Sequence, residues 1–524
     1  MKYPIGIQTF DKIREGGFAY VDKTGMVYRL AHEGQAYFLS RPRRFGKSLL
    51  LSTFSAYFRG RRELFRGLAI DSLETEWPSH AVLHVDLGGA DYTQPDALEA
   101  KLANYLSKWE KEYGLRPAND MLSERFINVI DAAYERTGRG VVVLIDEYDK
   151  PLLDVLGGTP SDGLADLETR HRNTLRGFYS VLKSSDRHLR LVFLTGVTKF
   201  AQVSVFSGLN NLEDISMSEE YDTICGITPA ELRSSFSAEV GELAARRGWS
   251  PDEAWDRLRR SYDGYHFSEA LSDVYNPFSL LNALKSKRID DYWFQTGTPT
   301  YLVRLMRGSD VHLDELTGRY YSKDEFEDYR ADRERPLPMI FQSGYLTIKG
   351  YEGDTGSYKL DLPNDEVRRG FLRLLADDYL GPRPGADPTV KQLYRSLSAG
   401  DFGSFRETLT EFLSSIPYTM RRKDTERERE RYFQYTFYLV LRLLSTYAVG
   451  VEVEQSRGRV DCVVRARQDV YVIEFKLDGG AREALAQIES RGYARPYASL
   501  GPRLHKVGVS FSSETGTIEE WEEE

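Results

Sequence analysis

The chain has 524 residues, 41% hydrophobic and 29% charged, which is the balance of a globular protein and excludes a disordered or fibrous one. Its 70 Lys and Arg against 80 Asp and Glu give a net charge of -10. This charge excludes a globally basic nucleic-acid coat, although not a local basic groove. At about 150 residues per domain, the length predicts about three domains.

Three features of the sequence bear on the cellular location of the protein: its cysteines, its N-terminus and its apolar runs. Cys225 and Cys462 are too far apart in sequence to form a disulfide framework or a zinc knuckle by themselves. His80 and His84 fall in a strand-like run, so we expect no metal pair there. The N-terminus lacks a signal-peptide pattern, and no apolar run reaches the roughly 18 residues of a membrane span. We therefore expect a cytoplasmic protein with no membrane partner.

The first third of the chain alternates strand-like and helix-like segments, which is typical of a parallel α/β sheet. Strands are predicted at residues 36–39, 81–87, 140–145 and 189–195. Helices are predicted over residues 48–58, 97–113, 121–136 and 172–184. The third strand is nearly pure aliphatic, so we expect it to be central and buried on both faces.

From about residue 218 the alternation stops. Helices are predicted over residues 229–247, 251–262 and 277–286, with proline at or near each first turn. A hairpin of residues 341–348 and 358–362, broken by glycines between them, would suit a winged-helix module. A proline- and glycine-rich stretch at 381–387 reads as a linker. We therefore predict domains at residues 1–217, 218–385 and 386–524.

The last domain returns to strands. Its predicted strands are residues 450–454, 460–465, 470–476 and 506–511. Its predicted helices are residues 390–413, 432–447 and 481–492. The basic residues at 421–431 are interleaved with acids, so a solvated helical face is at least as plausible there as a nucleic-acid contact. The acidic tail, residues 519–524, is expected to be solvated.

The segment after the first strand carries most of a phosphate-binding loop. Residues 41–48 read RPRRFGKS and match the generic G-x-x-x-x-G-K-[S/T] pattern except at the first glycine, which is arginine. Gly46 would let the backbone approach phosphate, Lys47 would neutralise the β- and γ-phosphates, and Ser48 would bind Mg²⁺. The other residues expected to line this ATP site are Arg43, Arg44 and Phe45.

A second ATPase motif follows the aliphatic strand, which ends in Asp146-Glu147. Asp146 would bind Mg²⁺ through its water shell, and Glu147 would polarise the attacking water. Thr195 ends the next strand, where a polar residue can sense the γ-phosphate. The alternative there is a capping threonine with a surface Lys199. The sequence does not choose among the candidate arginine fingers, which are Arg43, Arg44, Arg170 and Arg172.

A carboxylate–lysine pattern lies in the C-terminal strands. Glu474 and Lys476 are two residues apart in an apolar strand and therefore point to one face, where Asp461 could meet them. Two carboxylates can hold Mg²⁺ or Mn²⁺, and a lysine beside the metal can orient or deprotonate a water. Such a site hydrolyses phosphodiesters. Gln487 on the following helix strengthens the pattern, and a salt-bridged sheet face is the alternative.

These motifs together resemble a bacterial family that joins an AAA-like ATPase domain to a PD-(D/E)XK nuclease domain. The N-terminal resemblance rests on the segments PIGIQTF (4–10), YVDKT (20–24), FLSRPRRFGKS (38–48), DEYDKP (146–151) and TGVTKF (195–200). The rest of it lies in YDGYHF (262–267), YNPF (275–278), FQSGYL (341–346), GRVD (458–461), EFK (474–476) and the stretch 487–493. The family also has arginine at the first glycine position of its P-loop.

The resemblance implies an α/β multidomain fold: a P-loop parallel sheet, a helical or winged-helix-like middle and a restriction-endonuclease-like end. It implies ATP with Mg²⁺ at the first site. At the second site it implies Mg²⁺ or Mn²⁺ on Asp461 and Glu474, with Lys476 and Gln487 completing the catalytic set. Related nuclease domains often carry a histidine where Gln434 stands here.

Two functions from different classes stay open. In the first, the chain binds and hydrolyses ATP and its metal-dependent nuclease domain cleaves DNA or RNA; a role in defence against foreign DNA rests on domain analogy alone. In the second, the chain is a nucleotide-gated regulatory or scaffold ATPase whose nuclease-like domain only binds. A P-loop transferase is a third possibility, but the Asp-Glu pair fits hydrolysis better. We expect a homo-oligomer, because such ATPases often borrow an arginine from a neighbour.

Overall fold

The computed structural model describes residues 1–116, 119–157, 163–199, 211–295, 316–327, 335–380, 389, 392–393, 395–396, 399, 401–414, 452–454, 462–466, 469–497, 503–512, 515 and 517–524. The chain forms two compact units, Met1–Val367 and Arg368–Glu524, and each is described by itself. The predicted linker at 381–387, the basic segment at 421–431 and the helix at 432–447 lie outside the described residues. The three-domain division stays a prediction.

The first unit contains the predicted parallel sheet. Its strands, in the order β2-β3-β4-β1-β5, are Val82–Asp86, Val141–Asp146, Leu189–Gly196, Ala36–Ser40 and Glu213–Asp214. Every pairing is parallel, and β3 is buried along its whole length, as its aliphatic sequence predicts. Strand β4 lies between the P-loop strand β1 and β3, so their carboxyl ends share one edge of the sheet.

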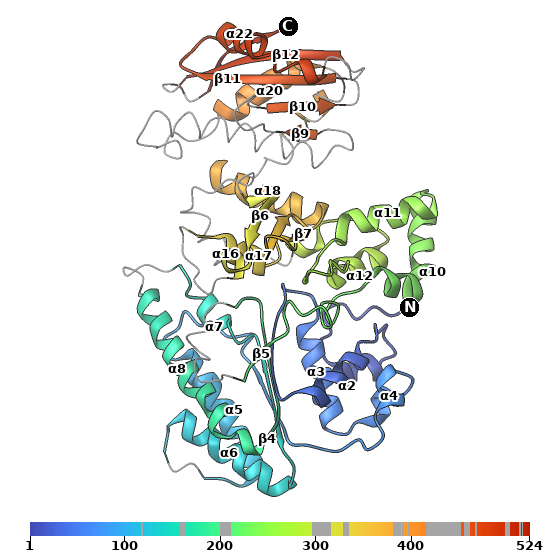
Figure 1. Ribbon diagram of the computed structural model, residues 1–524, viewed down its shortest axis with the longest axis vertical. Coiled ribbons are helices and arrows are strands. Elements are labelled where there is room, and N and C mark those ends of the chain that lie inside the picture. The colour runs from blue at the N-terminus through green and yellow to red at the C-terminus, as the bar shows by residue number, and fades with distance from the viewer. Residues whose placement is uncertain are drawn as a thin grey trace. The chain divides into compact units, whose positions relative to one another are not determined.

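Helices cover both faces of this sheet. They are α1 (Phe10–Glu15), α2 (Thr24–Glu33), α3 (Lys47–Phe58), α4 (Ala69–Leu73), α5 (Ala97–Tyr113), α6 (Leu122–Thr137), α7 (Lys150–Leu153) and α8 (Leu164–Ser184). In Figure 1, α5, α6 and α8 lie on one side of the strands, and α2, α3 and α4 lie on the other. The predicted helices are confirmed, although α8 begins eight residues before its predicted start at 172.

Three helices then follow: α10 (Pro229–Arg247), α11 (Pro251–Tyr262) and α12 (Pro277–Ser286). Each begins with a proline, and the residue before it accepts a hydrogen bond from a backbone N–H of the first turn; these caps are Thr228, Ser250 and Asn276. Such caps satisfy donors that the first turn leaves unpaired, so the local sequence fixes where each helix starts.

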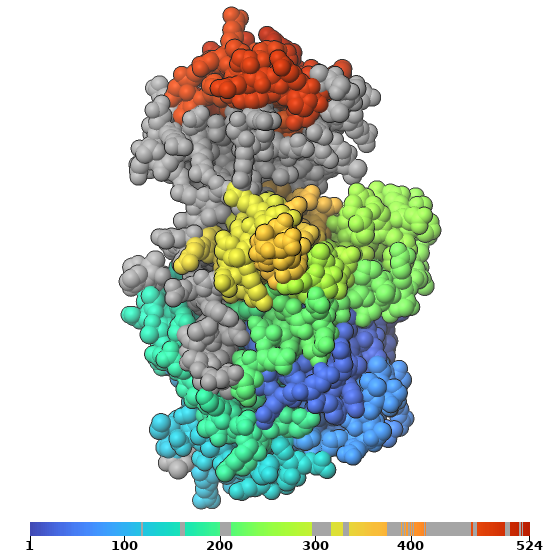
Figure 2. Space-filling model, viewed as in Figure 1, coloured from blue at the N-terminus to red at the C-terminus, as the bar shows by residue number. Residues whose placement is uncertain are grey.

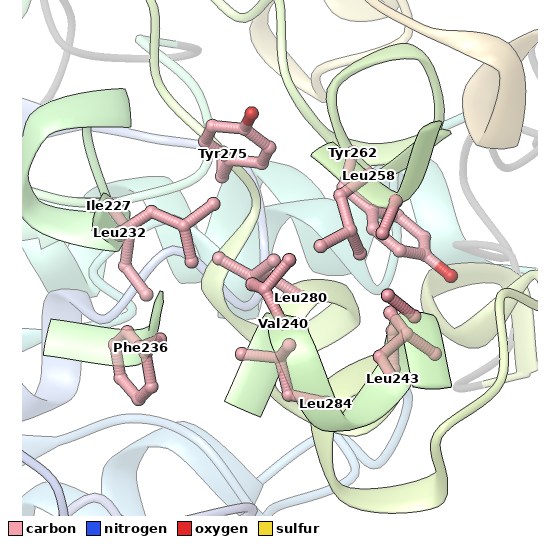
Figure 3. Close-up of a cluster of buried hydrophobic side chains, with 13 residues drawn as sticks. Ile227, Leu232, Phe236, Val240, Leu243, Leu258, Tyr262, Tyr275, Leu280 and Leu284 are labelled. Atoms are coloured by element: carbon pink, nitrogen blue, oxygen red, sulfur yellow. The ribbon is translucent and has the colours of Figure 1, made fainter. Parts of the chain in front are cut away.

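The three helices enclose a core of their own, drawn in Figure 3. It includes Phe236, Leu258 and Leu280, all buried. Tyr3 and Val21 from the N-terminal segment pack against this cluster. Figure 2 shows the same neighbourhood on the surface, where the green helices adjoin blue N-terminal residues. The N-terminus and the middle helices are therefore one packed body.

A three-stranded antiparallel sheet completes the first unit. It has the order β6-β8-β7, with β6 at Arg319–Ser322, β7 at Thr347–Glu352 and β8 at Ser357–Asp361. The hairpin is confirmed, but its first strand starts at 347 and not at 341, because Leu337–Gln342 form helix α17 with Pro338 in its first turn. The remaining α-helices of this unit are α13 (Tyr292–Gln295) and α16 (Lys323–Glu327), while α18 (Asp365–Leu380) begins in it and continues into the second unit.

The second unit contains a mixed five-stranded sheet. Its order is β13-β12-β11-β10-β9, with strands Ile518–Glu523, Arg503–Phe511, Asp469–Leu477, Cys462–Ala466 and Glu452–Glu454. Only the β11–β12 pairing is parallel. Helix α22 (Ala481–Arg491) packs on β11 and β12, and α20 (Phe402–Ser414) precedes the sheet.

The glutamates of the acidic tail are largely exposed, as expected for Glu519, Glu520, Glu523 and Glu524, but the tail is also part of a strand that the sequence did not predict. Residues 518–523 form β13, which pairs with β12 and turns Ile518 and Trp521 inward, at 8% and 9% exposure. Among the helices in the described ranges of the chain, none is both long and apolar enough to cross a membrane.

Candidate nucleotide and nuclease sites

The loop between β1 and α3 has the backbone shape of a phosphate cradle. Gly46 caps α3 with φ +99°, in the left-handed region that glycine adopts without steric cost. The helix N-terminus that follows offers unpaired N–H groups and a positive dipole end. The complete half of the predicted motif is therefore formed, although the first glycine is Arg41.

Lys47 is buried and folds back onto its own loop. Its Nζ donates to the main-chain oxygens of Arg41, at 2.7 Å, and of Pro42, at 3.1 Å. Burial lowers the pKa of Lys47, while the nearby Asp146 and Glu147 oppose that shift. A bound phosphate would exchange these neutral acceptors for charged ones, which form stronger hydrogen bonds.

A cavity of about 570 Å³ opens in front of this loop, and we call it the P-loop cavity. Its polar lining includes Arg43, Arg44, Gly46, Lys47, Ser48 and Glu147. Its apolar lining includes Ile5 and Ile7 from the N-terminus and Phe278 and Leu281 from α12. A cavity lined by both cationic and apolar side chains suits a nucleotide, whose phosphates and base differ in the same way.

The acidic side of the site lies where β3 ends. Asp146, 3% exposed, accepts hydrogen bonds at Oδ1 from Thr195 Oγ1 at 2.7 Å and from the Glu147 N–H at 3.0 Å. Glu147 has φ +52°, a strained conformation for a non-glycine residue, of the kind that occurs at functional sites. Burial, followed by Asp146, raises the pKa of Glu147. Thr195 thus contacts the predicted metal ligand.

Asp146 and Ser48 fit the predicted Mg²⁺. Both line the same second cavity, beside the P-loop cavity, and carboxylate and hydroxyl oxygens are the ligands Mg²⁺ prefers. Within the described segments, no three His, Cys, Asp or Glu side chains converge to hold a metal by themselves. The ion would therefore depend on water and on the phosphates of a bound nucleotide, as is usual for Mg²⁺.

Sequence reasoning assigned no role to Asp149. It is fully buried and accepts from the N–H groups of Val197 and Thr198, at 3.1 and 2.7 Å, and from Thr198 Oγ1 at 2.8 Å. It therefore joins the end of β3 to the end of β4. The one available signal was its place in the DEYDKP segment.

Lys199 is not a surface lysine, so that alternative is wrong. It is 4% exposed and pairs with Asp214 at 2.8 Å and with Glu327 of α16. Burial alone would lower the pKa of Lys199, but the two carboxylates raise it. Its backbone N–H donates to Gln342 of α17 at 2.7 Å. The segment after Thr195 is thus held by the middle of the chain.

The P-loop is held from the same side. The guanidinium of Arg41 is 1% exposed, donates to the carbonyl of Ser216 at 2.7 Å and lies 4.1 Å from the centre of the Phe267 ring. Burial lowers the pKa of Arg41 to about 10. A Cβ on Gly344 would lie 2.5 Å from Pro42, so only glycine permits this approach. The residue at the first glycine position is therefore a buried anchor.

The other loop residues also contact the middle of the chain. Trp293 Nε1 donates to the carbonyl of Arg43 at 3.2 Å, and the guanidinium of Arg44 lies 5.0 Å from the centre of the Phe278 ring. Phe45 does not line the P-loop cavity, because its ring is buried against Tyr265 and Phe267. Of the other candidate arginine fingers, Arg170 pairs with Asp96 and Glu99, and Arg172 pairs with Glu168.

In the second unit, three predicted residues meet on β11 and α22. Lys476 Nζ donates to Gln487 Oε1 at 2.6 Å, and Gln487 Nε2 donates to Glu474 Oε1. The Gln487 amide thus bridges the two side chains, and Glu474 is 3% exposed. Asp461 lies outside the described residues, as does Gln434.

Comparison with known proteins gives matches at both ends of the chain. Residues 4–206 match a family model described as Predicted AAA-ATPase, and residues 428–521 match one described as PD-(D/E)XK nuclease superfamily. A protein of Azotobacter chroococcum mcd 1, "Uncharacterized protein in vnfD 5'region", is 38% identical over 528 residues. That alignment covers 99% of this chain and 98% of the other protein.

Proposed function

Because the chain belongs to the family that joins a predicted AAA-ATPase domain to a PD-(D/E)XK nuclease-superfamily domain, we propose that it hydrolyses ATP and thereby controls metal-dependent cleavage of DNA or RNA. The observation that carries the first half is the P-loop cavity, which brings Lys47, Ser48 and Glu147 to one lining. The second half is carried by the Glu474–Gln487–Lys476 bridge.

At the first site, ATP places its β- and γ-phosphates on the Gly46 backbone and the Lys47 ammonium. Ser48 and Asp146 hold Mg²⁺, with Thr195 fixing the Asp146 carboxylate by its 2.7 Å hydrogen bond. Glu147 takes a proton from the attacking water, and the raised pKa of its buried carboxyl group suits that role. The adenine base of ATP lies toward the apolar lining of Ile5 and Phe278.

At the second site, Asp461 and Glu474 hold Mg²⁺ or Mn²⁺, and Lys476 orients the water that attacks the phosphodiester. Gln487 keeps the two β11 side chains in place through its amide. The chain works as a homo-oligomer in the cytoplasm. A neighbouring subunit of this oligomer supplies the arginine finger, which the sequence does not identify. Defence against foreign DNA is the role this pairing of activities suits.

One experiment tests both halves. The purified full-length chain is incubated with supercoiled plasmid or single-stranded RNA, with Mg²⁺, Mn²⁺ or a chelator, and with ATP, a non-hydrolysable analogue or no nucleotide. Phosphate release and strand scission are measured together, and size by light scattering. We expect metal-dependent scission that changes with the nucleotide, and a larger particle with the analogue.

Two outcomes divide the alternatives. Phosphate release without scission under any condition, together with a gel shift of the nucleic acid, would support the regulatory or scaffold ATPase. Absence of ATP cleavage by a folded chain would contradict the first half of the proposal.

A further inference from the structure

A second cavity, of about 370 Å³, lies beside the P-loop cavity and shares Ser48 with it. We call it the α3 groove, because α3 contributes one long wall and β2 lies opposite. The lining side chains that matter here are Ser48, Ser55, Arg59, His84, Asp86 and Asp146. The groove thus begins at the predicted magnesium and γ-phosphate position and leads away from it.

The groove has two distinct ends. Asp86 and Asp146 stand in register at the carboxyl ends of β2 and β3, beside Ser48 in the first turn of α3. Arg59 follows the last turn of α3, about 16 Å further along at 1.5 Å per residue. Its guanidinium donates to the carbonyl of Val82 at 3.4 Å, at the start of β2.

The two ends differ in their charged side chains. The end near Ser48 has the carboxylates of Asp86 and Asp146. At the far end, Arg59 donates only to neutral acceptors, and in the described part of the chain no carboxylate pairs with it. The neighbouring Arg61 forms ion pairs with Glu63 and with Glu15, the second at 3.4 Å. The carboxylate of Asp11 lies 3.9 Å from the Arg61 guanidinium. Asp11 and Arg61 also line the groove, but Arg59 is the lining cation that no described carboxylate pairs with, so an anion in the groove is attracted toward it.

The lining also calls for a polar ligand. His84 Nε2 is buried and has no hydrogen-bond partner among the described residues, and burial lowers the pKa of that imidazole. Buried polar atoms in native proteins are nearly always paired, with protein, ligand or water. The hydroxyls of Ser48 and Ser55 line the same space, whose volume far exceeds the roughly 30 Å³ of one water.

We propose that the α3 groove receives the orthophosphate that ATP hydrolysis releases, and that Arg59 is the residue that binds it. The inference rests on the proposed ATPase function. In that reaction the water oxygen bonds to the γ-phosphorus, the bond to the β–γ bridging oxygen breaks, and ADP and inorganic phosphate form. ADP stays in the P-loop cavity, while the phosphate moves past Ser48 along the groove to Arg59.

The test measures phosphate binding without turnover. Full-length protein saturated with Mg²⁺ and ADP is dialysed against radiolabelled inorganic phosphate at fixed ionic strength. We expect Arg59→Gln to weaken phosphate binding at least tenfold and Arg59→Lys to retain most of it. Ser55→Leu, which fills the groove, should weaken binding as well, and it tests the proposal if Arg59→Gln fails to fold. The matched control is Arg62→Gln, an arginine 61% exposed that does not line the groove.

Three results would overturn the proposal: no phosphate binding by the wild type, equal binding by the wild type and the groove variants, or binding lost in Lys47→Ala but kept in Arg59→Gln. The last would place phosphate on the P-loop alone. A wild type that binds phosphate through Arg59 but never cleaves ATP would contradict the proposed function and not the groove.

Discussion

The Lys47 ammonium donates to the main-chain carbonyl of Arg41 at 2.7 Å, while the Arg41 side chain donates to the carbonyl of Ser216 and lies over the Phe267 ring. The residue in place of the first P-loop glycine therefore anchors the loop through its side chain and presents its main-chain carbonyl to Lys47. A loop that glycine would leave mobile is here held by a buried guanidinium.

Replacing Lys47 by alanine should weaken ATP binding by one to two orders of magnitude. The lost contact is a charge-assisted hydrogen bond, worth about 1.5 to 3 kcal/mol. Titration of the purified chain with a fluorescent ATP analogue measures the change. Lys183→Ala, an exposed lysine at the end of α8, is the control. Unchanged affinity in Lys47→Ala would remove the lysine from the phosphate site.

Glu147→Gln should bind ATP normally but hydrolyse it about 10² to 10⁴ times more slowly, the contribution of general-base catalysis. The pH profile gives a second readout. Burial raises the pKa of Glu147, so the carboxylate needed as base is lost at a higher pH than for an ordinary glutamate. The wild-type rate should fall as pH drops through that raised pKa, and the glutamine variant should lack this limb.

Features that depend on residues close together in the sequence could be predicted from it, and contacts between residues far apart in the sequence could not. The aliphatic run of β3 and the Gly46-Lys47-Ser48 tripeptide carry their meaning within a few residues. The approach of Pro42 to Gly344 joins residues about 300 apart, and no periodicity signals it.

Strand β13 was not predicted from the sequence, for a different reason. Ile518 pairs with Phe511 and Glu520 pairs with Ser510, so one residue is inserted between them as a bulge. Ile518 and Trp521 therefore share a face although they are three residues apart. A search for strict alternation sees only acids around them.

Gly344→Ala should weaken ATP binding about tenfold, although Gly344 lies outside residues 4–206, which match the ATPase model. The new Cβ would lie 2.5 Å from Pro42 and push on the P-loop. Gly356→Ala is a matched control, since it also has positive φ, +64° against +86°, but nothing within 4 Å of the added Cβ. Both variants introduce backbone strain, but only Gly344→Ala would displace the P-loop. ATP titration of the two variants therefore distinguishes these two effects. Equal losses in the two variants would contradict the contact.

Asp263→Asn should stabilise the protein above neutral pH. Asp263 is 3% exposed, its Oδ1 lacks a partner in the described residues, and burial raises its pKa to about 7. Between pH 4 and 7 the unfolded chain carries this group ionised and the folded chain carries it protonated, so stability falls as pH rises, by up to about 4 kcal/mol. Asparagine cannot ionise and should abolish this loss. Thermal unfolding at pH 5 and 8 measures it, with the exposed Asp354→Asn as control.

At the proposed nuclease site, one substitution best distinguishes a catalytic role from a structural one. A buried glutamate and a half-buried lysine on one sheet face are costly unless paired or metal-bound, and the Gln487 amide between them could satisfy both without any chemistry. The two readings differ over Asp461, because a second carboxylate beside Glu474 adds repulsion in a structural cluster and is required in a metal site. Asp461→Asn should therefore abolish cleavage and leave ATP hydrolysis intact.

Substitutions of the other residues of the site should have different effects, according to the role of each residue. Lys476→Ala should abolish cleavage while Mn²⁺ binding, followed by calorimetry, stays measurable, because the lysine orients water and does not hold the metal. Gln487→Leu should lower cleavage about 10- to 100-fold, the usual cost of losing a residue that orients metal ligands. Glu489→Gln, on the same helix but paired with Lys506, is the matched control and should cleave normally. If the folded chain binds no divalent metal at this unit and cuts nothing under any nucleotide condition, the Glu474–Gln487–Lys476 bridge is structural and the domain only binds.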